Sequence, residues 1–260
     1  MYFFGDYHMH TTDSDGRGSM EQMVQTARKK GLQEIAITDH GPRNIGVGIR
    51  NTGVLLRARD HAHKLNELFD GEFRILVGVE ADVISCGGEI DVPGEVYREL
   101  DLLLVGLHPH VIPSDLETGA YLVGGNKLAY IFPPIREAVS KVNTRALVAA
   151  LSRHPVNIVT HPGLGMAVDI PAVARTCAQR GCAFEINTGH NYIKPSQVRQ
   201  AIREGAEIIV NSDAHFPETV GEFQAGWEVL LAAGADPDRV INLTKKGRER
   251  MAELKEESGR

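Results

Sequence analysis

Cysteine is scarce in this sequence of 260 residues, and the three present are Cys86, Cys177 and Cys182. Their spacing matches neither a zinc-ribbon nor a CxxC pattern, and an odd number does not suit a disulfide framework. Free thiols of this kind are typical of a reducing compartment, so we expect a cytoplasmic protein. The absence of a thiolate cluster also argues against a structural zinc site.

Two further absences narrow the possible functions. No apolar run approaches the roughly 20 residues that a membrane-spanning helix needs. The N-terminus lacks the charged and apolar regions of a signal peptide, so we expect no membrane association. The formal net charge is −6, with acidic and basic residues interspersed and no basic stripe. A nucleic-acid partner is therefore not expected.

Short apolar runs alternate with helical patterns about seven times along the chain. Strands are predicted within residues 2–7, 34–38, 74–84, 100–108, 156–163, 182–188 and 207–215. Helices are predicted at 19–31, 52–69, 135–153, 170–180, 195–204, 218–233 and 244–256, and 109–126 is predicted to be a long loop. This alternation is typical of a parallel α/β sheet closed, or nearly closed, into a barrel. The first turn lacks G-x-G-x-x-G, which argues against a doubly wound nucleotide-binding sheet.

Histidines and carboxylates stand where the predicted strands end. They are His8, His10, Asp39, His40, Glu80, His108, His161, Asp213 and His215. In a parallel barrel these ends converge on one face, where active sites lie. Each motif alone has a structural alternative, such as an Asp-His pair that caps a helix or a glutamate in a salt bridge. Their occurrence at six strand ends favours a metal site, and imidazole with carboxylate suits Zn, Mn or Fe.

The motifs HMHTTDSDG, TDH, GVEAD, GLHPH, THPG and NSDAH, in that order, resemble the PHP (polymerase and histidinol phosphatase) superfamily. The resemblance covers residues 6–215 and implies a distorted (β/α)7 TIM-like barrel with up to three divalent metal ions. No linker or break in composition marks a second domain, so we expect one domain over residues 1–260. Carried over position by position, the resemblance assigns His8, His10, Glu80 and Asp213 to the first ion. Glu80 would bridge to a second ion held by His108 and His161, and Asp15, His40 and His215 would hold the third. Asp13 is a competitor of Asp15.

The same resemblance implies hydrolysis of a phosphate ester by a hydroxide that bridges two of the ions. We expect Asp6 and Asp39 to orient imidazoles through their other ring nitrogen. A water, or an acid such as Asp39 or His190, is expected to supply the proton for the leaving group. Four cations of the predicted rim loops are candidates for binding phosphate: Arg17, Arg43, Arg50 and Lys194. For any one of them, a solvated loop cation is the alternative.

Three functions remain open at the level of the sequence. The first is a phosphatase of small phosphomonoesters, for which the resemblance makes L-histidinol phosphate the leading candidate. The second is a nuclease or phosphodiesterase that acts on nucleotides or nucleic-acid ends, against which the acidic balance counts. The third is a non-catalytic, metal-binding regulatory domain, against which the complete set of ligand positions counts. The sequence leaves the oligomeric state open.

Overall fold

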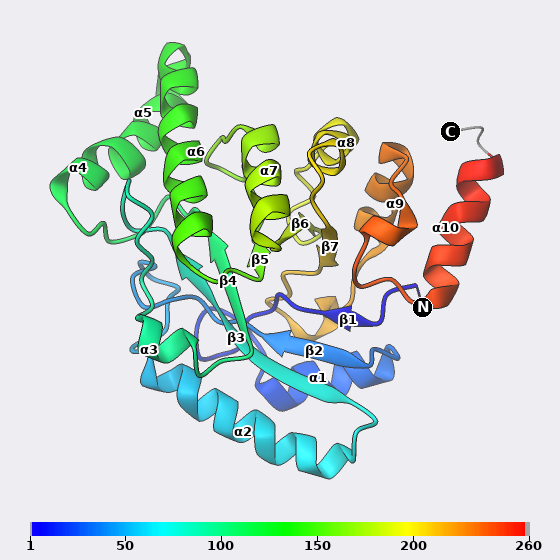
Figure 1. The fold of residues 1–260 in the computed structure, drawn as a ribbon. Coiled ribbons are helices and arrows are strands. Elements are labelled where there is room, and N and C mark those ends of the chain that lie inside the picture. The colour runs from blue at the N-terminus through cyan, green and yellow to red at the C-terminus, as the bar shows by residue number, and fades with distance from the viewer. Residues whose placement is uncertain (1, 258–260) are drawn as a thin grey trace.

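Seven parallel strands form the centre of the molecule in the computed structural model, which describes residues 2–257 (Figure 1). The strands pair in sequence order and are β1 Gly5–Asp6, β2 Glu34–Ile37, β3 Arg74–Asp82, β4 Leu102–Gly106, β5 Ile158–Val159, β6 Ala183–Asn187 and β7 Ile208–Asn211. Just beyond β1 and β7, Met9 and Ala214 form a parallel bridge that brings the two edge strands together. The sheet is therefore nearly closed, and the predicted distorted (β/α)7 barrel is confirmed.

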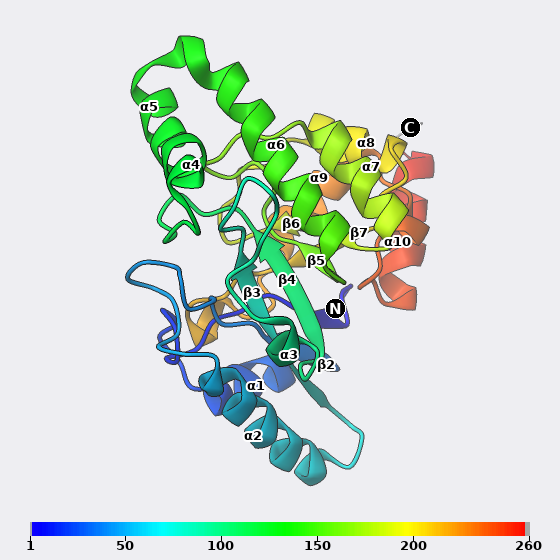
Figure 2. The same cartoon turned by 60° about the vertical axis from the view of Figure 1, so that its left-hand side comes forward.

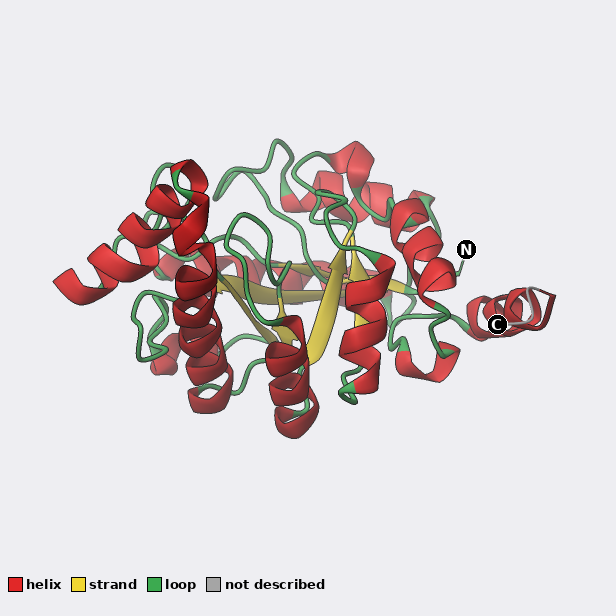
Figure 3. Cartoon of the chain, turned by 90° about the horizontal axis from the view of Figure 1, so that it is seen from above, coloured by secondary structure: helices red, strands yellow, loops and turns green. Residues whose placement is uncertain are grey.

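Helices cover the outside of this barrel (Figures 1 and 3). They are α1 Met20–Lys29, α2 Gly53–Phe69, α3 Gly94–Tyr97, α4 Leu116–Thr118, α5 Gly125–Ile131, α6 Arg136–Arg153, α7 Ile170–Arg180, α8 Pro195–Arg203, α9 Gln224–Ala233 and α10 Lys245–Glu257. Ser19 caps α1 and forms a reciprocal capping box with Gln22, as the Ser-x-x-Gln pattern indicates. Within residues 2–257, no helix combines the length and the apolar character needed to cross a membrane.

Side chains along the strands alternate between two cores. On β3, Ile75 and Val77 belong to the large core between sheet and helices, whereas Leu76 belongs to a smaller core. The smaller core draws side chains from β2 to β7 and from Tyr7 just after β1, so it fills the barrel interior. Because successive side chains of a strand point to opposite faces, polar residues two or four positions after an inward-facing residue also point into the barrel.

The structure corrects the predicted loop over residues 109–126. This segment contains α4, a π-helix at Gly119–Gly124 and the start of α5, which together stand out from the barrel (Figure 2). Asp115 starts the helical segment, since its carboxylate accepts the backbone N–H of Thr118 at 2.8 Å. Three glycines within seven residues indicate a loop by propensity, but the burial of Leu122 holds the segment in helical form.

Smaller corrections concern the ends of elements. The first strand is only Gly5–Asp6 rather than residues 2–7, and the strand predicted at 156–163 is only Ile158–Val159. The helix predicted at 218–233 begins at Gln224, after a separate 3₁₀ turn at Pro217–Thr219. Such ends depend on hydrogen bonds to neighbouring elements, which the local sequence does not specify.

Candidate metal centre

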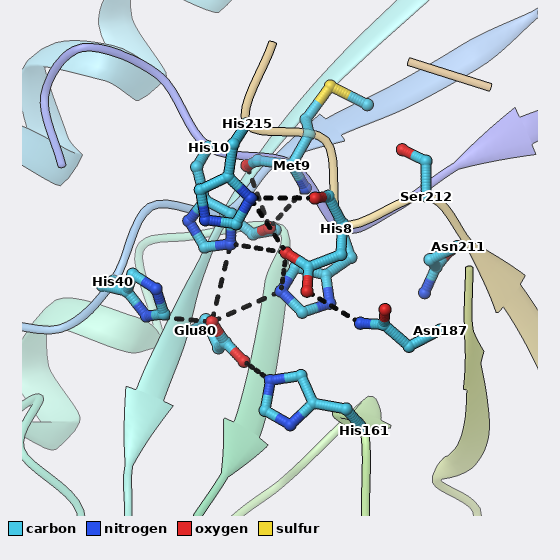
Figure 4. A network of polar contacts seen from close by, with 12 residues as sticks. His8, Met9, His10, His40, Glu80, His161, Asn187, Asn211, Ser212 and His215 are labelled. Carbon is cyan, nitrogen blue, oxygen red and sulfur yellow. Dashed lines mark hydrogen bonds and ion pairs between the residues drawn. The ribbon is translucent and has the colours of Figure 1, made fainter. Parts of the chain in front are cut away.

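The nine predicted ligands converge on one cluster at the carboxyl ends of the strands. Figure 4 shows His8, His10, His40, Glu80, His161 and His215 of this cluster. The nine ligands form four overlapping groups whose ligand atoms lie within 4.8 Å of one another: His10, Asp15, His40 and His215; His8, His10 and Asp213; His8, Glu80 and His161; and His40, Glu80 and His108. Each of the nine belongs to at least one group. Asp13, the competitor of Asp15, is exposed and belongs to none of these groups.

The alternation along β3 explains the position of Glu80, which lies four residues after Leu76 of the smaller core and therefore points along the barrel interior toward its carboxyl end. Asp213 lies two residues beyond the end of β7 and joins the cluster from the loop that follows this strand. Glycine is needed at position 106 of β4, since a Cβ atom there would lie 2.4 Å from the hydroxyl of Thr160 and 3.3 Å from Oε1 of Glu80.

Glu80 lies at the centre of the cluster and faces histidines from both of its oxygens. Its Oε2 lies 3.3 Å from His8 Nε2 and 2.9 Å from His40 Nδ1. Its Oε1 lies 2.8 Å from His161 Nε2 and 3.6 Å from His108 Nε2. Two oxygens of one carboxylate thus face two separate sets of imidazoles, which is the geometry that a carboxylate bridging two ions requires.

Within the same cluster, a second set of contacts surrounds Asp15, in the loop after β1. Its Oδ2 lies 3.2 Å from His215 Nε2, and its Oδ1 lies 3.9 Å from both His10 Nδ1 and His40 Nε2. The loop segment from residue 8 to residue 15 therefore contributes to both ends of the cluster, because His8 contacts Glu80 and Asp213 instead.

Several polar atoms of the cluster are buried without a hydrogen-bond partner. They are His8 Nε2, both ring nitrogens of His10, Asp15 Oδ1, His40 Nδ1, both carboxylate oxygens of Glu80, His161 Nδ1 and Asp213 Oδ1. Buried polar atoms are normally satisfied, so a group of orphaned donors and acceptors in one place needs a ligand. Nitrogen and oxygen ligands at this density fit divalent ions such as Zn, Mn or Fe. The cluster can hold several metal ions.

The electrostatics of the cluster also favour the binding of cations. Burial favours the neutral form of the Glu80 carboxyl, but the surrounding imidazoles hold its pKa well below the usual range. Burial favours neutral His108 as well, but the charges of Asp82 and Glu80 raise the pKa of His108 to about 9. Burial dominates at His10 and lowers its pKa to about 4. The carboxylates of the cluster are therefore ionised at neutral pH and available as ligands.

Two acidic residues for which the sequence predicted no role hold His108 and His8 in place. Asp82 hydrogen-bonds Nδ1 of His108, and Glu185 on β6 hydrogen-bonds Nδ1 of His8 at 2.8 Å. Glu185 also accepts the backbone N–H of His161 at 2.7 Å. Each leaves the Nε2 atom of its histidine turned toward Glu80. A charged residue inside the apolar strand CAFEIN was the sequence signal for Glu185.

The predicted orienting role of Asp6 and Asp39 is wrong. Asp6 accepts hydrogen bonds from the backbone N–H groups of Ser212 at 3.0 Å and Gly221 at 2.9 Å, and from the Ser212 hydroxyl. Asp39 accepts them from Thr11 N at 2.7 Å, from the Thr11 hydroxyl at 2.8 Å and from the Ser14 hydroxyl. Both carboxylates are buried and fix the backbone around the cluster. Burial raises the pKa of the Asp39 carboxyl, and its role as a proton donor to a substrate stays a prediction.

Two neighbouring cavities open onto the cluster. One, of about 350 Å³, is lined by cluster ligands together with Leu107, Pro109 and Leu164. The other, of about 630 Å³, is lined by Arg17 and Phe216 and shares Asp15, His190, Asp213 and His215 with the smaller cavity. Together they offer a charged floor with partly apolar walls, as a small phosphorylated molecule would require.

The predicted substrate residues differ in their position relative to these cavities. His190 lines both, and its Nε2 atom lies 3.3 Å from Asp213 Oδ2. Arg17 lines the larger cavity. In the described part of the chain, Arg43, Arg50 and Lys194 line neither cavity, and Arg50 and Lys194 are exposed.

Two cluster residues have left-handed backbone conformations. His161 has a φ of 26° and Asp213 a φ of 51°. Such values are strained for residues other than glycine and persist where surrounding contacts impose them, often at functional sites. At His161 the backbone N–H donates to the Glu185 carboxylate, and at Asp213 the side chain accepts a hydrogen bond from the Asn187 amide at 2.9 Å.

Comparison with known proteins agrees with this geometry. The family model described as PHP domain matches residues 6–159. "Probable phosphatase YcdX" of Escherichia coli O1:K1 / APEC is 30% identical over 257 residues, which cover 93% of this chain and 90% of that protein. The fold is similar to that of histidinol phosphate phosphatase from Lactococcus lactis, solved with Zn, L-histidinol and phosphate. Its TM-score is 0.63 at 17% identity, over 89% of this chain and 94% of the other. By its family match and its curated relatives, this chain belongs to the PHP domain family.

Proposed function

We propose that this chain is a metal-dependent phosphatase of small-molecule phosphomonoesters, in a single domain over residues 1–260. The observation that carries the proposal is the bridging position of Glu80 among orphaned, buried ligand atoms. When bound, divalent ions in such a site lower the pKa of water and offset the charge of a phosphoryl group. Membership of a family whose curated relatives are named as phosphatases supports the proposal.

We propose three ions, of Zn, Mn or Fe. His8, His10, Glu80 and Asp213 would hold the first, Glu80, His108 and His161 the second, and Asp15, His40 and His215 the third. The ligand groups in the structure overlap this assignment, and three histidines group with ligands of more than one ion. His8 also lies with Glu80 and His161, His10 also lies with the Asp15 group, and His40 also lies with Glu80 and His108.

The chain's own residues would bind and protonate the substrate beside the ions. Arg17 would pair with phosphoryl oxygens in the larger cavity, since it is always charged and lines that wall. The backbone N–H of Arg17 binds the carbonyl of His215 at 2.6 Å, which ties its position to the cluster. His190, about half exposed beside Asp213, would hold the proton that the leaving alkoxide needs. Arg43, Arg50 and Lys194 would act only if their loops move toward the site.

The walls of the site favour a compact substrate over a polymer. Leu107 and Leu164 line the smaller cavity, and neither cavity is lined by a row of basic residues. We therefore place L-histidinol phosphate and similar small esters ahead of nucleic-acid ends. A nuclease of nucleic-acid ends and a non-catalytic metal-binding domain are the competing functions. We also propose a cytoplasmic location, which the free state of Cys86, Cys177 and Cys182 supports.

The test is metal analysis of the purified chain combined with a substrate panel. The panel holds histidinol phosphate, sugar phosphates, nucleotides, an aryl phosphate and a single-stranded oligonucleotide. We expect more than one equivalent of a divalent metal and metal-dependent release of phosphate from at least one monoester. Cleavage of the oligonucleotide alone would identify a nuclease, and a metal-loaded protein inactive on the whole panel would identify a regulatory domain. Either result overturns the proposal.

A further inference from the structure

A half-exposed aromatic ring lines the larger cavity beside the metal cluster. Outside residues 112–132, three large hydrophobic side chains are exposed in the described part of the chain: Ile45, Leu68 and Phe216. Phe216, 51% exposed, lines the larger cavity, and Ile45 directly precedes Gly46, which lines it too. Two of these three exposed side chains therefore lie at or next to the cavity, where a bound ligand would cover apolar surface.

The backbone that carries Phe216 is fixed beside the metal cluster. The preceding residue, His215, stacks its ring on that of His10, with the two ring centroids 4.5 Å apart (Figure 4). Thr219 holds the other side, because its backbone N–H and its hydroxyl donate to the carbonyl of Phe216 at 3.0 and 2.9 Å. The ring is therefore carried on a fixed turn next to the cluster, as a substrate-binding side chain requires.

The lining of the larger cavity combines a charged part with a neutral part. Among the described residues that line it, the carboxylates belong to the metal cluster, and Arg17 is the one permanent cation. Apart from His190, the rest of the lining has no ionisable side chain, and Val47 and Phe216 supply its apolar side chains. A substrate that fills this cavity therefore combines a phosphoryl group with an uncharged, partly apolar organic group.

We propose that Phe216 selects the organic part of the substrate by stacking on a flat ring. The substrates are then phosphomonoesters that carry an uncharged aromatic or heteroaromatic ring, which rests on the phosphatase function proposed above and narrows its substrate class. Aromatic rings attract one another in offset-stacked and edge-to-face arrangements, so an aromatic wall favours an aromatic ring over a saturated ring of the same size. The volume of about 630 Å³ lies in the range of cavities that hold such ligands.

The charges of the two cavities separate this class from amino esters. L-Histidinol phosphate carries an ammonium group in addition to its ring, and a buried ammonium group needs a carboxylate partner. Among the described residues that line the two cavities, every carboxylate belongs to the metal cluster: Asp15, Glu80 and Asp213. Within the class of small esters, a neutral ring therefore suits the larger cavity better than a ring on a cationic chain.

The test compares two ligands that differ in the aromaticity of one ring. Benzylphosphonate and cyclohexylmethylphosphonate have the same length and release no phosphate, so calorimetry with the metal-loaded chain measures their binding without turnover. We expect the wild-type chain to bind benzylphosphonate about 3- to 10-fold more tightly, the contribution of an aromatic pair beyond its buried area. Phe216→Leu keeps an apolar side chain but removes the ring, and it should abolish this preference.

Phe132→Leu is the matched control, because it makes the same substitution at a side chain that is 54% exposed and lines neither cavity. This variant should keep the wild-type preference. Circular dichroism and metal content verify that both variants are folded. With benzyl phosphate and cyclohexylmethyl phosphate as substrates, the preference should appear in KM with kcat nearly unchanged, because the ring lies away from the bond that breaks.

The outcomes distinguish this proposal from the phosphatase function on which it rests. A wild-type chain that does not bind benzylphosphonate, or that binds both phosphonates equally, overturns the role of Phe216, as does a preference that survives Phe216→Leu. Release of phosphate from monoesters without the preference overturns that role and leaves the phosphatase function in place. A preference that Phe216→Leu abolishes, in a chain that releases no phosphate, supports the ring-binding role and overturns the phosphatase function instead.

Discussion

Glu185 lies behind the cluster of histidines, and two of its contacts determine how that cluster is presented. Its Oε1 atom binds His8 Nδ1 at 2.8 Å and Asn211 Nδ2 at 2.9 Å, and its Oε2 atom accepts the N–H of His161 at 2.7 Å. A carboxylate behind a ligating imidazole fixes its tautomer and raises its basicity. Glu185 is thus a positioning residue for two ligands that follow different strands, β1 and β5.

Glu185→Gln should lower metal affinity by roughly 10- to 100-fold, because an amide cannot replace the charge behind His8. Competition of the metal-loaded protein with a chelator measures this affinity. Glu207→Gln, an exposed position just before β7, is the control and should leave affinity unchanged. If the variant only melts at a lower temperature, with metal affinity intact, the role of Glu185 is structural.

Glu80→Gln tests the bridging position directly. The substitution keeps the size of the side chain but removes the charge that faces two sets of imidazoles, so kcat/KM should fall by about 100- to 1,000-fold. Steady-state kinetics and metal analysis on the same sample separate lost catalysis from lost metal. Glu89→Gln, exposed in the turn after β3, controls for the change of charge. Unchanged turnover with metal still bound would show that the bridging assignment is wrong.

At the scale of elements, Asp91 joins segments that the chain places far apart. Its Oδ1 accepts the N–H of Asp82 at the end of β3 at 2.8 Å, and its Oδ2 accepts the N–H of Arg43 after β2 at 3.0 Å. Burial and the neighbouring charge of Asp82 raise the pKa of Asp91 to about 7, against the lowering effect of these two amides. The Asp91 carboxyl is therefore charged at high pH and neutral at pH 5.

This pKa gives a pH dependence of stability with a defined sign. A carboxyl whose folded pKa is raised binds more protons in the folded chain than in the unfolded one. Its contribution to the free energy of unfolding therefore falls as the pH rises from about 4 to about 7. Denaturant titrations of wild type and Asp91→Asn should give a stability difference that shrinks over this interval. Asp70→Asn, on an exposed loop, controls for the net charge. A difference that is constant with pH would contradict the prediction.

The elements also show which parts of the fold were predictable. Runs such as LDLLLVGLH end in a polar residue because the strand is buried on both faces and the site begins where it stops. That pattern revealed Glu80, His108 and Asp213 and the order of the strands. The helical segment at Leu116–Ile131 was not predictable. Gly119, Gly124 and Gly125 indicate a loop by propensity, and the sequence does not show that Leu122 is buried. Asp82 was missed because its partner, His108, is contributed by another strand.

At the scale of the whole molecule, the cluster joins the first and the last strands of the barrel. His8 follows β1, Glu80 lies on β3 and Asp213 follows β7, so ligands from the first and last strands meet over the centre. Few backbone hydrogen bonds close the barrel at this point, where Met9 and Ala214 form the parallel bridge between the edge strands. Metal ions bound at this point would cross-link strands that few backbone hydrogen bonds hold together.

Removal of metal should therefore destabilise the fold as well as abolish activity. A ligand that binds only the folded chain adds about 2.7 kcal/mol of stability at 100 times its dissociation constant. For a chain of this size, that corresponds to a fall in Tm of roughly 5–10 °C on chelation. The fall should be larger than this single-ion figure, since the metal-free cluster leaves Glu80 and Asp213 oxygens buried and unpaired. Calorimetry before and after dialysis against a chelator measures the change, and adding Zn or Mn should restore it. The Glu80→Gln variant should show a smaller change on chelation than wild type, because it holds less metal. If chelation removes the metal and leaves the Tm of the wild-type chain unchanged, the cluster does not serve as the closure of the barrel.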